Sequence, residues 1–140
     1  MKFLMTAAAM TMGLSLTATA AFAGDDMMQK VEAADQSVAN GIVSADSITA
    51  AQNGWLVVHR TDETMKPGPV VAYAPLRAGE TKDVAAILTE EVKPGEMLML
   101  MIHAEDGGMQ TGVFEYTLGA KEDGPIRVDD KLVMTTITAM

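Results

Sequence analysis

Methionine and histidine side chains alternate along one stretch of the chain and could bind a metal ion together. Met97, Met99, Met101 and His103 alternate with aliphatic residues, so they would fall on one face of a strand. Thioether and imidazole groups are ligands suited to copper, and methionine favours Cu(I). The only other histidine, His59, could add a ligand from a neighbouring strand. These five residues are the candidate metal ligands, and copper is the cofactor they would take.

The two histidines occupy equivalent places in two similar stretches. Residues 56–62, LVVHRTD, match residues 100–106, LMIHAED, at Leu, His and Asp, and Gly68 and Gly112 follow at the same spacing. This pattern indicates a pseudo-repeat, although two strand–turn–strand units can also converge on it.

The same methionines have a simpler interpretation as core residues. Methionine fills ordinary hydrophobic cores, and it is frequent throughout this chain, with 13 residues in total. The opposite face of the stretch carries Leu98, Leu100 and Ile102, which are the better core candidates because branched side chains pack with defined rotamers. The methionine face would then lie under a loop, against a partner or a second copy of the chain, or around a soft metal ion.

The sequence lacks the signatures of an enzyme. It has no cysteine and no G-x-S-x-G elbow, and neither histidine lies beside a serine in a recognisable setting. The carboxylate pairs Glu90-Glu91 and Asp129-Asp130 lie in apparent turns, where solvated surface charge is the simpler explanation. We therefore expect no enzymatic activity.

Composition and the first residues indicate an exported protein with one domain. Residues 1–23 have the basic start, apolar stretch and A-x-A end of a signal peptide, so the mature chain would be located in the periplasm or outside the cell. Residues 24–29 are expected to be flexible, and residues 30–140 are long enough for a single domain. A formal net charge of −9 argues against nucleic acid as a partner.

Short apolar stretches separated by turn signals predict an all-β fold. We expect an antiparallel β-sandwich of seven to eight strands, immunoglobulin-like or cupredoxin-like, with Trp55 in its core. The prolines around residues 70–74 favour an edge position for that strand. Residues 112–118 are expected to form the hairpin partner of the methionine-rich strand. The predicted strands are 30–37, 41–48, 55–60, 70–74, 83–88, 97–104, 112–118 and 131–139, with a tight turn at Asn40-Gly41.

Several motifs together resemble a known family of exported domains. They are Asp35-Gln36-Ser37, Gly54 to His59, Gly79, Leu100 to Gly107, Gly112 to Tyr116 and Asp123-Gly124-Pro125. On these motifs the chain resembles a family of exported β-rich domains, found in bacteria and haloarchaea, that is catalogued as a domain of unknown function. The resemblance implies a secreted β-rich module and supplies no catalytic residues.

The expected function is therefore an exported, non-enzymatic binding or structural module whose ligand the sequence does not identify. A periplasmic copper carrier with Met and His ligands is the alternative, on the type of ligand alone. The partner would be a protein or a surface, or a second copy of the chain. We expect neither nucleic acid binding nor a membrane span in the mature chain.

Overall fold

Nine strands and no helix are found in the computed structural model, which describes residues 28–118 and 120–140. The prediction of an all-β fold is therefore confirmed. The predicted signal peptide and most of the predicted flexible segment, residues 24–27, lie outside the described residues. In the part of the chain that is described, no helix is long and apolar enough to cross a membrane. The strands are β1 (Lys30–Glu32), β2 (Ile42–Ala50), β3 (Gly54–Thr61), β4 (Val70–Leu76), β5 (Gly79–Leu88), β6 (Met97–Ala104), β7 (Arg127–Val128), β8 (Lys131–Leu132) and β9 (Met134–Thr138).

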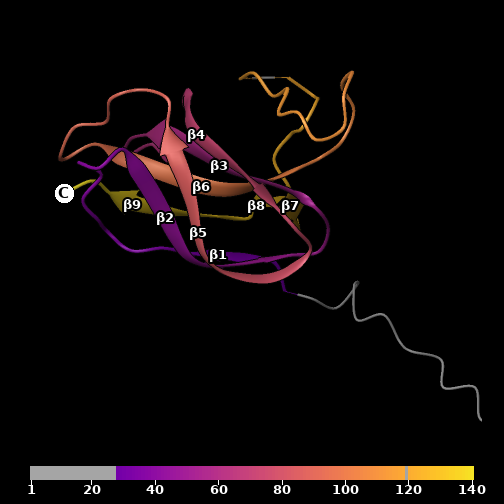
Figure 1. The fold of residues 1–140 in the computed structure, drawn as a ribbon, viewed down its shortest axis with the longest axis horizontal. Coiled ribbons are helices and arrows are strands. Elements are labelled where there is room, and N and C mark those ends of the chain that lie inside the picture. Colours follow the sequence, from indigo (N-terminus) through magenta and orange to yellow (C-terminus); the bar gives the residue numbers. More distant parts are fainter. Residues whose placement is uncertain (1–27, 119) are drawn as a thin grey trace, which may run out of the picture.

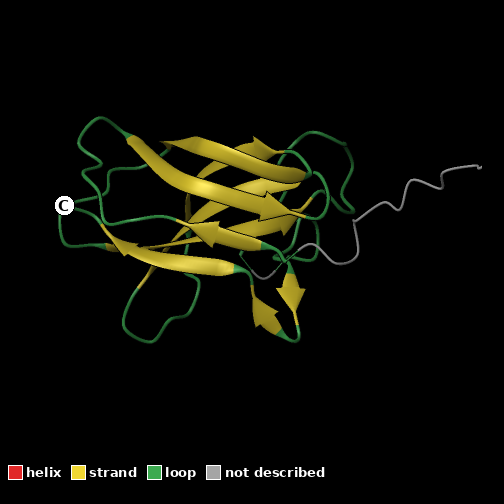
Figure 2. Ribbon diagram, turned by 90° about the horizontal axis from the view of Figure 1, so that it is seen from below, coloured by secondary structure: helices red, strands yellow, loops and turns green. Residues whose placement is uncertain are grey.

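Seven of these strands form one antiparallel sheet that nearly closes on itself. Their order is β1-β2-β5-β4-β3-β6-β9, and β7 and β8 form a separate small hairpin. Figure 1 shows the sheet wrapped around a common interior, and Figure 2 shows its twisted strands in yellow with loops at both ends. The result is a barrel-like variant of the predicted sandwich, in which one sheet supplies both walls.

Residues just after β1 close the gap between the two ends of the sheet. Gln36 forms a parallel bridge with Ala139, and its carbonyl accepts a hydrogen bond from Met140 N at 2.9 Å. The Gln36 side chain bonds both backbone groups of Ser44 in β2, each at 2.8 Å. One residue therefore connects β2 with the chain around β9. β1 is shorter than predicted because its backbone pairs with β2 only as far as Glu32, and Gln36 then pairs with Ala139.

The inner face of the sheet encloses the main hydrophobic core. Leu98, Leu100 and Ile102 of β6 are fully buried there, together with Leu56 and Val58 of β3. Aliphatic side chains from the five remaining strands of the large sheet (β1, β2, β4, β5 and β9) complete this core. The prediction that Leu98, Leu100 and Ile102 form the core face of β6 is therefore confirmed.

Two predicted strand positions are wrong. β4 is not an edge strand, since it lies between β3 and β5. Pro75 lies within β4 and is tolerated because β4 pairs with β5 only at Ala72 and Tyr73, so Pro75 loses no ladder bond to β5. Asn40-Gly41 does not join β1 and β2 as a two-residue hairpin, because β1 ends at Glu32 and Gln36 bridges the gap in between.

Residues 112–118 do not form a strand either, and β9 pairs with β6 in their place. They belong to a long loop, residues 105–126, which we call the covering loop; its residue 119 is not described. Figure 1 shows it, in orange, rising from the end of β6 beside β7 and β8. The loop is built on carboxylates instead of a ladder: Glu115 accepts hydrogen bonds from Met109 N at 2.9 Å and from Gln110 N at 3.3 Å.

Trp55 is buried, with 5% of its surface exposed, but it does not lie in the main core. It points to the outer face of the sheet, where Val57, Met99 and Met101 form a second buried cluster with it. Phe114 of the covering loop packs against this cluster. The outer face is therefore apolar because the covering loop shields it, one of the three arrangements that the sequence left open.

Candidate metal centre

The two histidines meet on the outer face beneath the covering loop. His59 lies opposite Met99 in the β3–β6 ladder, whereas His103 lies opposite Trp55, so the two are offset along the strands. Their side chains reach toward each other across this offset, and the Nε2 atoms come within 3.2 Å. The ring centroids are 5.3 Å apart, and both residues are fully buried. We call His59 and His103 the histidine pair.

Backbone carbonyls fix the tautomer of each ring. The Nδ1 atom of His59 lies 2.7 Å from the carbonyl oxygen of Gly68, and that of His103 lies 2.6 Å from the carbonyl oxygen of Asp123. A carbonyl oxygen can only accept a hydrogen bond, so both Nδ1 atoms must carry the proton. In the neutral form of each ring, the Nε2 atom then has a free lone pair, and the two lone pairs face each other.

Burial disfavours any additional proton on this pair. Burial lowers the pKa of His59, and it lowers the pKa of His103 to about 4, despite the opposing effect of the bond to the Asp123 carbonyl. Both rings are therefore neutral at physiological pH, which is the form in which imidazole binds a metal ion.

Glycines allow the backbone to approach both rings. The Gly68 carbonyl reaches His59 because the loop packs directly on β3: Gly68 N donates to Arg60 O at 2.7 Å, and a Cβ at Gly68 would meet that same oxygen at 2.7 Å. A Cβ at Gly54 would overlap the carbonyl oxygen of His103 in the facing strand. Glycine at these two positions lets the segments that hold the histidine pair pack closely.

Asp123 connects the histidine pair to the covering loop. Its carbonyl holds His103, while its carboxylate accepts hydrogen bonds from Asp106 N at 3.0 Å and Glu115 N at 2.8 Å. Asp123 is fully buried and has a φ of 47°. A single residue thus orients one ring, anchors the loop above it and supplies a negative charge, and that charge raises the pKa of His103 against the effect of burial.

Aromatic side chains of the covering loop form the roof of the pair. The Tyr116 ring stands edge-on to His103, with centroids 4.6 Å apart, and lies 5.9 Å from His59. Phe114 lies 6.1 Å from His103 and also packs on Trp55 and Tyr73. The pair is therefore enclosed by apolar and aromatic groups.

The structure gathers four of the five predicted ligand residues. Met99 and Met101 are buried on the same face as the histidine pair: Met99 is directly opposite His59, and Met101 is the next residue before His103 on that face. Met97 is placed apart, half-buried at the far end of β6 and opposite Thr61. Among the described residues, no group of three or more His, Cys, Asp or Glu side chains comes together as a metal site. The buried thioethers of Met99 and Met101 lie on the same face as the pair and are the soft donors there.

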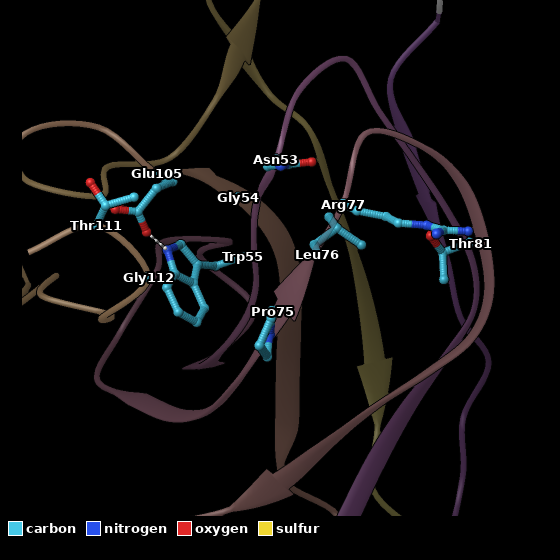
Figure 3. Close-up of a pocket in the computed structure, with 10 residues that line it drawn as sticks. All are labelled: Asn53, Gly54, Trp55, Pro75, Leu76, Arg77, Thr81, Glu105, Thr111 and Gly112. Atoms are coloured by element: carbon cyan, nitrogen blue, oxygen red, sulfur yellow. Dashed lines mark hydrogen bonds between the residues drawn. The ribbon is translucent and has the colours of Figure 1, made fainter.

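A recess of about 580 Å³ lies at the end of the sheet, next to the outer face. Figure 3 shows Trp55 on one side of it, with its Nε1 donating to Glu105 at 2.9 Å, and Pro75 below; the Arg77 side chain extends away toward Thr81. Trp55 is therefore shared between this recess and the second cluster. The contact with Glu105 fixes the indole beside the roof of the histidine pair.

Sequence reasoning missed Asp123, Gly68 and Tyr116. In the sequence, Asp123 stands out only through the Asp123-Gly124-Pro125 motif of the resembling family, and nothing in its spacing indicates that its carbonyl reaches His103. Phe114 and Tyr116 fall within the predicted strand 112–118, at alternating positions that would share one face. Both do lie over the outer face, but they come from a loop.

Comparison with known proteins gives a family for this chain and no characterised relative. No curated protein and no solved structure matches the chain significantly. One family model, described as "Domain of unknown function (DUF7282)", matches residues 29–140 and so spans all nine strands, the histidine pair and the covering loop. On this match over most of its length, the chain belongs to the DUF7282 family.

Proposed function

We propose that this protein is an exported, non-enzymatic metal-binding module that holds one Cu(I) ion between His59 and His103. The observation that carries the proposal is a count of protons. Three contacts surround the two rings: two from Nδ1 to a carbonyl and one between the Nε2 atoms. Each contact needs a proton to be attractive, but two neutral imidazoles carry only two. A cation between the Nε2 atoms would replace the third proton.

The separation of the two nitrogens supports a shared ion. Imidazole nitrogens bind zinc at about 2.0–2.1 Å, so two such ligands at a tetrahedral angle are about 3.3 Å apart, whereas ligands on opposite sides of an ion are about 4 Å apart. The Nε2 atoms are 3.2 Å apart. The pair therefore fits two neighbouring ligands of one ion and leaves room for a third.

The surroundings favour a soft, singly charged ion. The soft donors buried on the same face as the pair are the thioethers of Met99 and Met101, and thioethers select Cu(I). The buried carboxylate of Asp123 balances one positive charge near the pair. A divalent ion would leave an uncompensated charge in an enclosure roofed by Phe114 and Tyr116, which is costly.

The predicted export and the lack of cysteine explain why the ligands would be histidine and methionine. Residues 1–23 have the pattern of a signal peptide, and a chain without cysteine must bind copper through histidine and methionine. The proposal thus gives the exported binding module a specific ligand, and it agrees with the copper-carrier alternative.

Anaerobic titration of the processed protein with Cu(I), against a competing chromophoric chelator, tests the proposal. We expect one tight equivalent, and no comparable uptake of Zn(II). His59→Gln and His103→Gln should each weaken Cu(I) binding by at least about 100-fold, since each removes a direct ligand and even an outer partner of a ligand is worth about 10–100-fold.

Met109→Leu provides the matched control, because Met109 is 94% exposed and belongs to neither buried cluster. It should bind Cu(I) like the wild type. A wild-type protein that takes up no Cu(I), or a His59→Gln/His103→Gln variant that binds it with unchanged affinity, would refute the proposal.

A further inference from the structure

Methionines continue across the outer face from the histidine pair to the protein surface. In the β6–β9 ladder, Met101 is opposite Met134 and Met99 is opposite Thr136. Met134 packs against the second buried cluster, which contains Met101. The buried thioether beside His103 therefore has a half-buried thioether as its cross-strand neighbour.

An exposed methionine extends this series. Met65 lies in the loop between β3 and β4, and 42% of its surface is exposed. Its Sδ atom is 3.9 Å from the Thr136 hydroxyl, and the Sδ atom of Met134 is 4.0 Å from the same hydroxyl. One hydroxyl thus lies against two thioethers, one of which is exposed to solvent.

The backbone at Met65 is unusual for this residue type. Its φ is 59°, in the left-handed region that glycine and asparagine adopt most readily. The turn is held by Met65 N donating to Asp62 O at 3.0 Å and by Thr64 N donating to the Asp62 carboxylate at 2.8 Å. A methionine at such a position carries a conformational cost that a glycine would avoid, so an outlier of this kind points to a use for its side chain.

The charges beside this loop suit a cation. A recess of about 510 Å³ next to it is lined by Asp62, Glu63 and Met97, together with Glu96, whose carboxylate is paired with Arg60. Acidic groups around a surface hollow raise the local concentration of cations. Thioethers next to it would then retain soft cations more strongly than hard ones.

We propose that Met65 and Met134 form a surface docking site for a soft monovalent cation, from which the ion passes to the buried histidine pair. The destination rests on the function proposed above, but binding at the docking site does not. All donors along the series are neutral side chains, so the transfer exchanges ligands without moving an electron or a proton. Met97, which the structure separates from the histidine pair, lines the acidic recess beside the docking site.

Ag(I) is a suitable probe because it is soft and monovalent, and we would follow it through the ε-methyl NMR signals of the methionines. In the His59→Gln/His103→Gln variant, Ag(I) should shift the signals of Met65 and Met134 and leave that of Met109 unchanged. In the wild type, Met65→Leu/Met134→Leu should slow the uptake of Ag(I) by at least tenfold, with the affinity of the histidine pair unchanged within about threefold. Met109→Leu is again the control.

The outcomes separate the two proposals. Tight wild-type binding, with an uptake rate that Met65→Leu/Met134→Leu does not change, would refute the passage of the ion from the docking site to the histidine pair. Shifts at Met65 and Met134 without any tight binding would refute the histidine-pair site and support the docking site. Unchanged Met65 and Met134 signals in the histidine double variant would refute the docking site.

Discussion

Acidification should destabilise the metal-free protein through the histidine pair. When the chain is unfolded, an imidazole takes up its proton as the pH falls through about 6.5. In the folded protein, burial holds the pKa of His103 at about 4. The unfolded state therefore binds more protons between these two pH values, and the free energy of unfolding falls as the pH falls. Well above pH 6.5 both rings are neutral in both states, so the pair adds no pH dependence there.

The size of the effect follows from the shift. Each pKa unit corresponds to about 1.4 kcal/mol, so lowering the pH from 7 to 4 should remove about 3 kcal/mol through His103. His59 adds to this loss, because burial lowers its pKa as well. The other titratable groups packed against the pair are Tyr116 and Asp123, both from the covering loop.

Urea unfolding at a series of pH values, with a metal chelator present, measures this loss. The His59→Gln/His103→Gln variant is the control for the carboxylates: hydrogen bonds and nearby cations lower the pKa of Asp62, Glu80 and Glu96, so their contributions also decline near pH 4 in both proteins. The difference between the two proteins should stay constant above pH 6.5 and change by about 3 kcal/mol below it. A difference that stays flat down to pH 4.5 would refute the reasoning about the buried pair.

Three further predictions concern packing, and one concerns processing. Trp55→Ala should lower the free energy of unfolding by about 3–5 kcal/mol, because it empties a buried site under the covering loop; an unchanged thermal midpoint would contradict this. Gly54→Ala should cost about 1–3 kcal/mol in urea unfolding, because its methyl group would overlap the facing strand. Asp123→Ala should cost about 3 kcal/mol and make the covering loop sensitive to limited proteolysis, since two backbone N–H groups lose a charged acceptor; resistance equal to that of the wild type would argue against the anchor. Intact mass of the exported protein should show cleavage between Ala23 and Gly24, and a membrane-bound species that retains the leader would mean an anchor.

The sequence was most informative where the side-chain period alone determines the structure. Alternation in residues 97–104 predicted β6 and its core face, because a strand places every second residue on the same side. The equivalent positions of His59 and His103 indicated related roles. Their meeting depends on the β3–β6 register, which offsets the two residues and which neither stretch encodes alone.

The sequence did not allow us to predict which hydrogen-bond partners the covering loop and β4 would find. Phe114 and Tyr116 alternate as in a strand, but they belong to the covering loop, in which the carboxylates of Glu115 and Asp123 accept hydrogen bonds from backbone N–H groups. β4 looked like an edge because of its prolines, and only its short pairing with β5 explains why the centre of the sheet accepts it. Both cases were decided by hydrogen-bond partners that the pattern of apolar residues does not encode.

The bridge at Gln36 has a consequence for how copies of this protein can associate. A strand from a second molecule could extend the sheet at this seam only after displacing the contacts that Gln36 makes with Ser44, Ala139 and Met140. Unpaired sheet edges are where β proteins join into fibres, so this seam acts as a block to growth of the sheet. A chain without cysteine has no disulfide to resist unfolding, so it gains from having this route to aggregation obstructed. If two copies do associate, they should meet through their faces or loops and not through this seam.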